Sequence, residues 1–97
     1  MNIIIKRSDK PGKKFDAVVD DKKVIRFGQK FASDFTQHKN EDRKKNYIQR
    51  HVPRENWNNP LTPGFYSRWI TWEKPTLKEA VNNVNRKFKN INVKLKV

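Results

Sequence analysis

The sequence contains no cysteine, which excludes disulfide bonds, thiolate nucleophiles and cysteine-based zinc sites together. It has only three glycines, Gly12, Gly28 and Gly64, and none belongs to a phosphate-binding loop. The apolar run at residues 1–5 is too short for a secretion signal, and no run approaches the roughly 20 apolar residues of a membrane span. We therefore expect a protein that acts inside a cell, or inside an assembly made within a cell.

Side chains that could perform catalysis are also scarce. His38 and His51 are the only histidines, and their separation matches no metal-ligand spacing. The adjacent acids at 20–21 and 41–42 are explained by a turn and a helix start. No serine has the context of a nucleophile elbow. The sequence predicts a non-enzymatic protein with no cofactor, no metal and no small-molecule substrate.

Acidic residues are few in relation to basic ones. The chain has 23 Lys and Arg against 10 Asp and Glu, a net charge of +13. Such an excess indicates a polyanionic partner, which is a nucleic acid, an acidic protein surface or a membrane face.

The chain is long enough for a single domain, residues 1–97, with a small core. Its 97 residues are 34% hydrophobic, and the mean hydropathy is −1.07. Aromatic residues make up 11% of the sequence. Because each buried Trp or Phe removes roughly 150–250 Å² from water, they are expected to supply much of the core.

Residues 59–88 hold the strongest helix signals. Thr62 before Pro63 is typical of a helix start, and Pro75 ends that helix, so we expect a helix over 64–72. Thr76 and Glu79 then form a capping-box pattern that predicts a second helix over 77–88. A third helix is expected over 41–51.

Four segments have strand patterns. Residues 15–19 and 24–27 flank two aspartates and predict a hairpin. Residues 91–97 alternate strictly between apolar and polar, and the β-branched run at 1–5 is the natural partner. The fold class is α+β, with a small antiparallel sheet of N-terminal strand, hairpin and C-terminal strand packed with three short helices. The predicted core is Phe15, Phe27, Phe35, Phe65, Trp69, Trp72, Leu77, Val81, Val84 and Phe88.

The segment 29–39 has no clear secondary-structure pattern. Phe31 and Phe35 are too apolar for a solvated loop, so we expect both to attach it to the core.

The candidate partner-binding residues are basic. Five belong to the helix at 41–51 and its exit, and three follow at the end of the last helix, without acids from residue 80 onward: Arg43, Lys44, Lys45, Arg50, Arg54, Arg86, Lys87 and Lys89. The alternative is a solvated surface whose Lys and Arg stems cover apolar area. The imbalance of sign favours a polyanion.

Two further interpretations remain open. Trp57, Tyr66, Trp69 and Trp72 could stack on single-stranded bases, although helical spacing favours a core. The two helices between 64 and 88 also permit a helix-turn-helix that reads duplex DNA through Asn82, Asn85 and Arg86.

The chain resembles a family of small basic proteins of unknown function that large DNA viruses and some phages encode. The resemblance covers residues 15–88 and is carried, in this order, by FDAVVDDKKVIRFG, SDFTQHKNEDRKKNYIQRH, RENWNNPLTPGFYSRWITW and KPTLKEAVNNVNRKF. Two positions depart from the usual pattern: Tyr66 stands where many members have Trp, and Asn40-Glu41 where Asp-Pro is common. The resemblance implies a viral protein carried in the particle, and it supplies no catalytic residues.

Two functions therefore compete. One is a structural component of a virus particle, a minor capsid or internal protein that contacts acidic capsid surfaces or packaged DNA. The other is a free nucleic-acid-binding protein that contacts phosphates without regard to sequence. We favour the first, with the protein located in the virion or in the host cell during infection.

Overall fold

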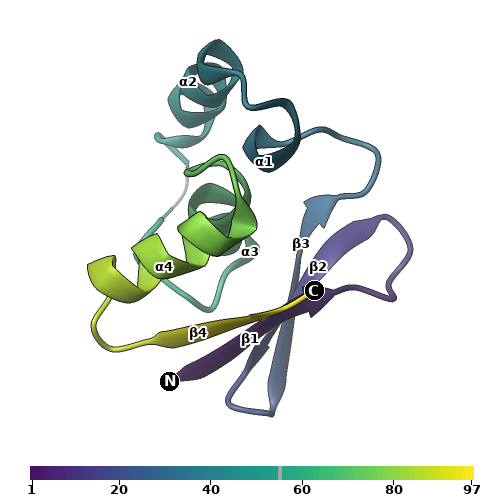
Figure 1. Cartoon of the computed structure of the whole chain (residues 1–97), viewed down its shortest axis with the longest axis vertical. Helices are drawn as coiled ribbons and strands as arrows, with labels where there is room; N and C mark the ends of the chain where they lie inside the picture. The colour runs from purple at the N-terminus through teal and green to yellow at the C-terminus, as the bar shows by residue number, and fades with distance from the viewer. Residues whose placement is uncertain (55) are drawn as a thin grey trace.

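The computed structural model describes residues 1–54 and 56–97. A four-stranded sheet is covered on one face by short helices, as shown in Figure 1, which confirms the α+β class. The strands are β1 (Asn2–Arg7), β2 (Lys13–Val19), β3 (Lys23–Gln29) and β4 (Asn92–Lys96). The helices are α1 (Phe35–His38), α2 (Glu41–His51), α3 (Pro63–Tyr66), the π-helix η1 (Ser67–Thr71) and α4 (Leu77–Lys87).

The hairpin of β2 and β3 is confirmed. Asp20 and Asp21 both have positive φ, 50° and 58°, and the Lys22 N–H donates to the Val19 carbonyl at 3.0 Å. Two consecutive residues with positive φ match the right-handed twist of the strands, which explains the tight turn.

The sheet is mixed: the expectation of an antiparallel sheet holds for the pairs β1–β2 and β2–β3 and is wrong for β1–β4. The strand order is β3-β2-β1-β4, and β4 pairs with β1 as predicted but runs parallel to it. β3 points in the same direction as β1, and the helices carry the chain back to the end of the sheet where β1 begins (Figure 1). A strand that starts there must run parallel to β1.

The predicted caps position two helices correctly. α2 spans the expected 41–51, and the Asn40 side chain accepts from the N–H groups of Asp42 and Arg43. α4 ends one residue earlier than expected, and the Thr76 hydroxyl accepts from the Glu79 N–H at 3.2 Å.

The helix expected at 64–72 is not a continuous α-helix. One turn, α3, starts at Thr62 and Pro63 as predicted and is followed by η1. Residues 68–71 are all buried, although four consecutive residues of an α-helix spread around its circumference. The wider π turn accompanies burial against both the sheet and the helices beside it. An unexpected turn, α1, also forms where Asp34 and Gln37 make a capping box.

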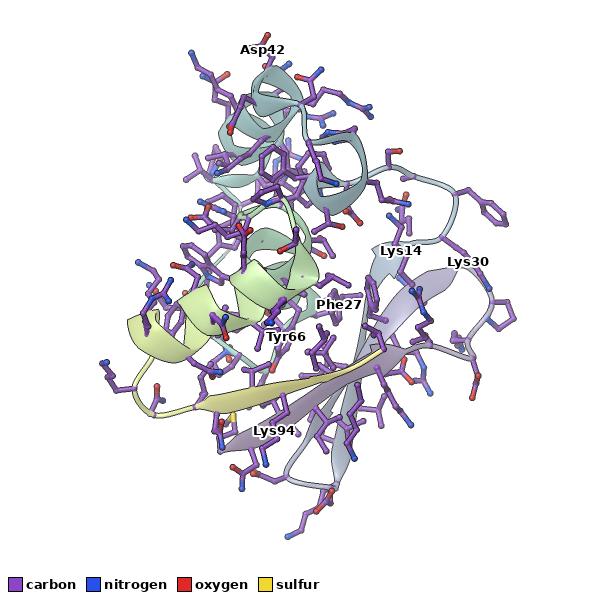
Figure 2. The ribbon with its side chains drawn as sticks, viewed as in Figure 1. Lys14, Phe27, Lys30, Asp42, Tyr66 and Lys94 are labelled. Atoms are coloured by element: carbon purple, nitrogen blue, oxygen red, sulfur yellow. The ribbon has the colours of Figure 1, made fainter. Side chains whose placement is uncertain are left out.

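The core lies between the sheet and the helices. The Phe27 and Tyr66 rings meet at 5.4 Å in its centre, where Figure 2 shows them pointing toward one another. Seven of the predicted core residues are buried, and three, Trp72, Leu77 and Phe88, are half-buried. Phe35 is buried as predicted, but Phe31 is 95% exposed, so the expectation that it joins the core is wrong.

Tyr66 carries a polar group in the centre of this core. Its side chain is fully buried, and its hydroxyl has no hydrogen-bond partner among the described residues. Burial raises the pKa of Tyr66, so the hydroxyl stays neutral at any ordinary pH. We expect Tyr66→Phe to raise the free energy of unfolding by about 1 kcal/mol, because it removes an unpaired buried hydroxyl and retains the ring.

Urea unfolding of the wild type and the variant tests this expectation. Phe65→Leu, which changes the neighbouring buried ring, should destabilise and provides the control for packing. A loss of stability in Tyr66→Phe would show that the hydroxyl has a partner, such as a bound water molecule.

Candidate polyanion interface

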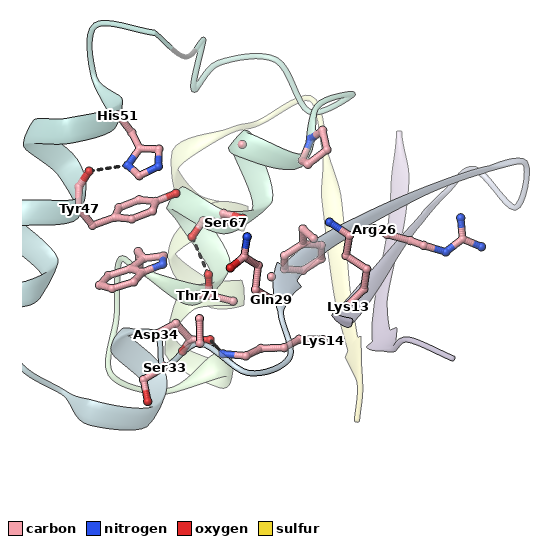
Figure 3. A pocket seen from close by; sticks show the side chains of 16 residues that line it. Lys13, Lys14, Arg26, Gln29, Ser33, Asp34, Tyr47, His51, Ser67 and Thr71 are labelled. Carbon is pink, nitrogen blue, oxygen red and sulfur yellow. Dashed lines mark hydrogen bonds and ion pairs between the residues drawn. The ribbon is translucent and has the colours of Figure 1, made fainter. Parts of the chain in front are cut away.

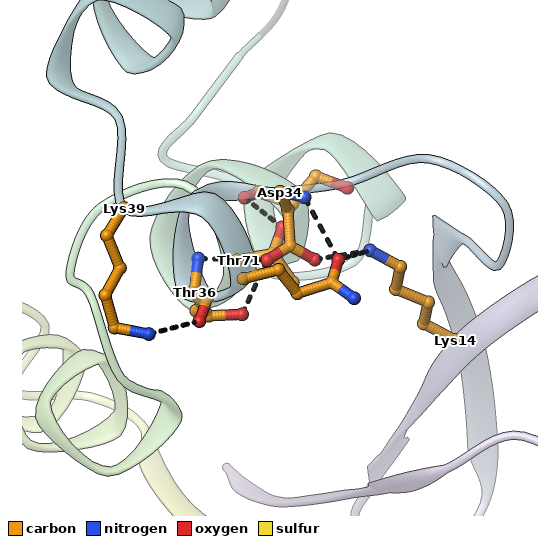
Figure 4. A network of polar contacts seen from close by, with 7 residues as sticks. Lys14, Asp34, Thr36, Lys39 and Thr71 are labelled. Atoms are coloured by element: carbon orange, nitrogen blue, oxygen red, sulfur yellow. Dashed lines mark hydrogen bonds and ion pairs between the residues drawn. The ribbon is translucent and has the colours of Figure 1, made fainter.

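Asp34, the most buried carboxylate of the described residues, is neutralised from within the protein. It accepts from the Lys14 ammonium of β2 at 2.7 Å, and from the backbone N–H and hydroxyl of Thr36 in α1. Figure 4 shows these contacts converging on the carboxylate. The charge of Lys14 is thus used to attach α1 to the sheet.

Glu73 has the same role on the helical side. The Arg68 guanidinium of η1 donates to its carboxylate at 2.7 Å. The Lys44 ammonium of α2 lies 3.5 Å from that carboxylate and donates to the Glu73 carbonyl at 2.8 Å. Burial alone would raise the pKa of Glu73, but the hydrogen bond and charge of Arg68, with the charge of Lys44, hold the pKa below its usual range.

The exposed surface is therefore left strongly positive. Eighteen of the 23 Lys and Arg side chains are exposed, whereas only six of the nine described carboxylates are. The other three, Asp16, Asp34 and Glu73, each lie in an ion pair with a cation of this chain. Pairing inside the protein thus removes carboxylates from the surface.

The basic helix does not present its cations in one direction. Arg43 and Arg50 are two turns apart and lie on one side of α2, both exposed and both lining the same groove. Lys45 is exposed on another side of the helix, beside Glu41 and Ile48. Lys44 points inward to Glu73 and also lies over the Phe35 ring at 5.1 Å. The three cations at 43–45 therefore point in three directions, and Lys44 stabilises the fold through its contacts with Glu73.

The remaining predicted cations lie on two other segments. Arg54 is exposed in the turn after α2. Arg86, Lys87 and Lys89 are exposed around the C-terminal end of α4, where Lys87 lies over the Trp69 ring at 5.0 Å. α2 packs on α1, whereas α4 packs on η1 and β4, so the predicted set falls into separate groups on the helical layer.

The helix-turn-helix interpretation is weakened, because one of the side chains expected to contact bases is already hydrogen-bonded within the protein. The Asn85 side chain donates to the Val93 carbonyl at 2.9 Å and accepts from the Val93 N–H at 2.8 Å. The Asn85 side chain therefore pairs with the backbone of β4 at the edge that faces away from β1. The amide oxygen and N–H that would contact a base are already used there. Of the aromatic residues considered for stacking, Tyr66 and Trp69 are buried in the core.

A set of cations on the uncovered face of the sheet lies outside the predicted binding residues, although Lys94 and Lys96 belong to the basic excess after residue 80. One row of cross-strand neighbours runs Lys96, Lys6, Asp16 and Arg26, and Lys94 stands in the next row beside Ile4. Figure 2 shows Lys94 on the side away from the helices. The strict alternation of residues 91–97 could have identified the face that Lys94 and Lys96 share.

Two described side chains that could perform acid–base chemistry, Asp34 and His51, lie apart. A pocket of about 350 Å³ between the β2–β3 end and α2 is lined by Asp34 and His51, among others. Figure 3 shows them on different sides of the pocket, with Asp34 bonded to Lys14 and the His51 ring 2.8 Å from the Tyr47 carbonyl. The hydroxyl of Thr71 donates to the Ser67 carbonyl at 2.8 Å. Asp34, His51 and Thr71 are therefore each in contact with another group of the protein within this pocket.

Metal sites and membrane spans can be assessed only for residues 1–54 and 56–97. There, no three His, Asp or Glu side chains gather in a way that could hold a metal ion. None of the helices in these two ranges is long and apolar enough to cross a bilayer.

A family model matches residues 3–51, which run from β1 to the end of α2, and its description is "Family of unknown function (DUF5754)". No curated protein and no solved structure matches this chain.

Glu73 gives a prediction about the helical layer. We expect Glu73→Gln to lower the free energy of unfolding by about 1–3 kcal/mol, because Arg68 and Lys44 then keep their charges without a carboxylate. Glu79→Gln removes the same charge from an exposed position of α4 and should change stability by less than about 0.5 kcal/mol. Urea unfolding measures both, and equal effects would argue against the role of Glu73.

His38 gives a prediction about pH. Burial first, and then the charge of Arg43, lower the pKa of His38; the charge of Asp34 opposes them by less, and Lys14 adds a still smaller lowering. Its Nδ1 accepts from the Asn40 N–H at 2.9 Å, which requires that nitrogen to be unprotonated. As pH falls below about 6.5, the unfolded chain takes up the proton before the folded one, so stability decreases.

Unfolding midpoints at about pH 7.5 and about pH 5.5 measure this loss. His38→Asn retains an acceptor near the position of Nδ1 and should reduce the loss. An undiminished loss in that variant would assign the pH dependence to other groups.

Proposed function

Since this chain belongs to DUF5754, a family of unknown function, we propose from its own surface that it is a non-enzymatic protein that binds the phosphate backbone of nucleic acid. The observation that carries this proposal is the distribution of charge. The paired carboxylates are the three less exposed ones, and 18 cations remain exposed against six acids on the described residues. A surface with this imbalance repels itself, and solubility alone does not require it.

The binding residues that we propose are the predicted cations that are exposed. Lys44 is left out, because Glu73 already holds it. The proposed set is Arg43, Lys45, Arg50, Arg54, Arg86, Lys87 and Lys89. Phosphate contacts of this kind position a protein on nucleic acid without reading its sequence.

The setting that we propose is a virus particle, where the protein contacts packaged DNA as an internal or minor capsid component. The resemblance to small basic proteins of large DNA viruses supports this setting. Mass spectrometry of purified particles tests it, and absence of the protein there would favour a free nucleic-acid-binding protein.

Binding is tested by fluorescence polarisation with a labelled DNA duplex over a series of salt concentrations. Each neutralised phosphate contributes about −0.9 to the slope of log affinity against log salt. Contacts by four to six of the proposed cations should give a slope of roughly −4 to −5. A wild-type protein that fails to bind DNA at low salt would contradict the proposal.

A pair of matched variants locates the contacts. Arg43→Ala with Arg50→Ala should weaken binding to every sequence and flatten the slope by about 2, since two contacts are lost. Lys22→Ala with Lys23→Ala removes the same charge from the exposed tip of the hairpin, outside the proposed set. Equal losses in both variants would indicate a response to net charge alone.

A further inference from the structure

Phe31 departs from the packing of every other large apolar side chain in the described residues. It is 95% exposed, whereas the next most exposed, Val52, is 55% exposed. The turn that carries Phe31 is ordered by a hydrogen bond from the Ala32 N–H to the Gln29 carbonyl at 3.1 Å. A single exposed apolar residue needs no special explanation, so the surroundings of Phe31 decide whether it has a role.

An open groove of about 850 Å³ lies between this turn and α2. We call it the Phe31 groove, and it is lined by Phe31, Arg43, Asn46, Gln49, Arg50 and Trp72, with the short side chains at 32–33. None of the described residues that line it is acidic. Its charge therefore suits an anion.

The groove combines charge with aromatic surface. Arg43 and Arg50 are seven residues apart on α2, which separates them by about 10.5 Å along the helix axis. Trp72 is held in place by the Tyr47 ring, which stacks on it at 4.4 Å with an interplanar angle of 3°. Asn46 and Gln49 lie between the arginines and bring amides, which both donate and accept hydrogen bonds.

We propose that the Phe31 groove binds single-stranded nucleic acid, with an unpaired base stacked on Phe31 and phosphates held by Arg43 and Arg50. This inference rests on the proposed function and specifies its ligand. A solvent-exposed ring stacks most readily on a base that is free of its duplex, because insertion into a duplex costs the unstacking of base pairs. Stacking beside a cationic groove is the common way of holding a single strand.

The alternative occupant is an acidic protein segment, since aromatic residues and arginine are also enriched at protein interfaces. Arginine in a groove without acids fits regularly spaced phosphates, which it can contact with two parallel hydrogen bonds. The single strand is thus the ligand that uses both the charge and the exposed ring.

The experiment compares three labelled probes of equal phosphate number: a single-stranded oligo-dT, a hairpin duplex, and an oligonucleotide with several abasic positions. The full-length wild type should bind oligo-dT more tightly than either of the other two. Phe31→Ala should lower the affinity for oligo-dT roughly 5- to 100-fold, the effect of losing one stacked base. Its affinity for the duplex should stay within about twofold, because no base is free to stack there.

Matched variants separate stacking from apolar surface and from charge. Phe31→Tyr keeps a ring and should bind oligo-dT as the wild type does. Val52→Ala removes another exposed apolar side chain, outside the lining of the groove, and should leave binding unchanged. Phe31→Trp places a fluorophore at the stacking position, and oligo-dT should quench it while the duplex does not.

The outcomes distinguish this inference from the proposed function. If the wild type binds DNA but Phe31→Ala binds oligo-dT equally well, the Phe31 groove has no such role and the phosphate-binding function stands. Equal wild-type affinity for the normal and abasic strands would also overturn the stacking. If poly-glutamate binds with the same dependence on Phe31, the occupant is an acidic protein. Failure of the wild type to bind any nucleic acid would refute both proposals.

Discussion

One carboxylate, Glu73, joins the two parts of the helical layer. α2 precedes it by more than twenty residues and contributes Lys44, whereas η1 contributes Arg68 from the turn just before it. Because both cations are mostly covered, neither can be left without a carboxylate at low cost. Trp72 adds an apolar contact at the same junction, where it stacks on Tyr47 of α2. The direction in which α2 presents Arg43 and Arg50 depends on this junction, and so does the shape of the Phe31 groove.

The pairing of carboxylates with buried cations also explains why the surface of the protein is strongly positive. Asp34 and Glu73 neutralise Lys14, Lys44 and Arg68, so carboxylates are used where the protein must bury cations that attach one element to another. On the uncovered sheet face, by contrast, two cations lie next to each other. Lys6 and Lys96 are direct neighbours on β1 and β4, where like charges destabilise the pair. Stability alone would not place them there, whereas the polyanionic partner that we propose would relieve their repulsion.

Local signals predicted the elements better than the contacts between them. Asn40, Thr62 and Thr76 define helix starts because a cap depends only on nearby backbone. The direction of β4 depends on the path of the chain through the helical layer, which no local pattern contains. The π turn of η1 accompanies burial on two sides, and the inward direction of Lys44 depends on its contacts with the carboxylate and carbonyl of Glu73, twenty-nine residues away. The exposure of Phe31 could not be predicted, because the preference of apolar residues for the core is statistical and does not fix the place of a single side chain in a turn.

The two cationic faces differ in the contacts that they can make. Lys6, Lys94 and Lys96 extend from a regular sheet, and their ammonium groups are flexible point charges that attract phosphates without fixing them. Arg43 and Arg50 stand on a helix whose orientation the Glu73 junction fixes, and their planar guanidinium groups can contact a phosphate with two parallel hydrogen bonds. Within the proposed function, the sheet face therefore accelerates the encounter with nucleic acid, whereas the Phe31 groove determines how long the strand stays bound. This division follows from geometry, because of these two faces it is the groove that offers aromatic side chains, Phe31 and Trp72, beside its cations.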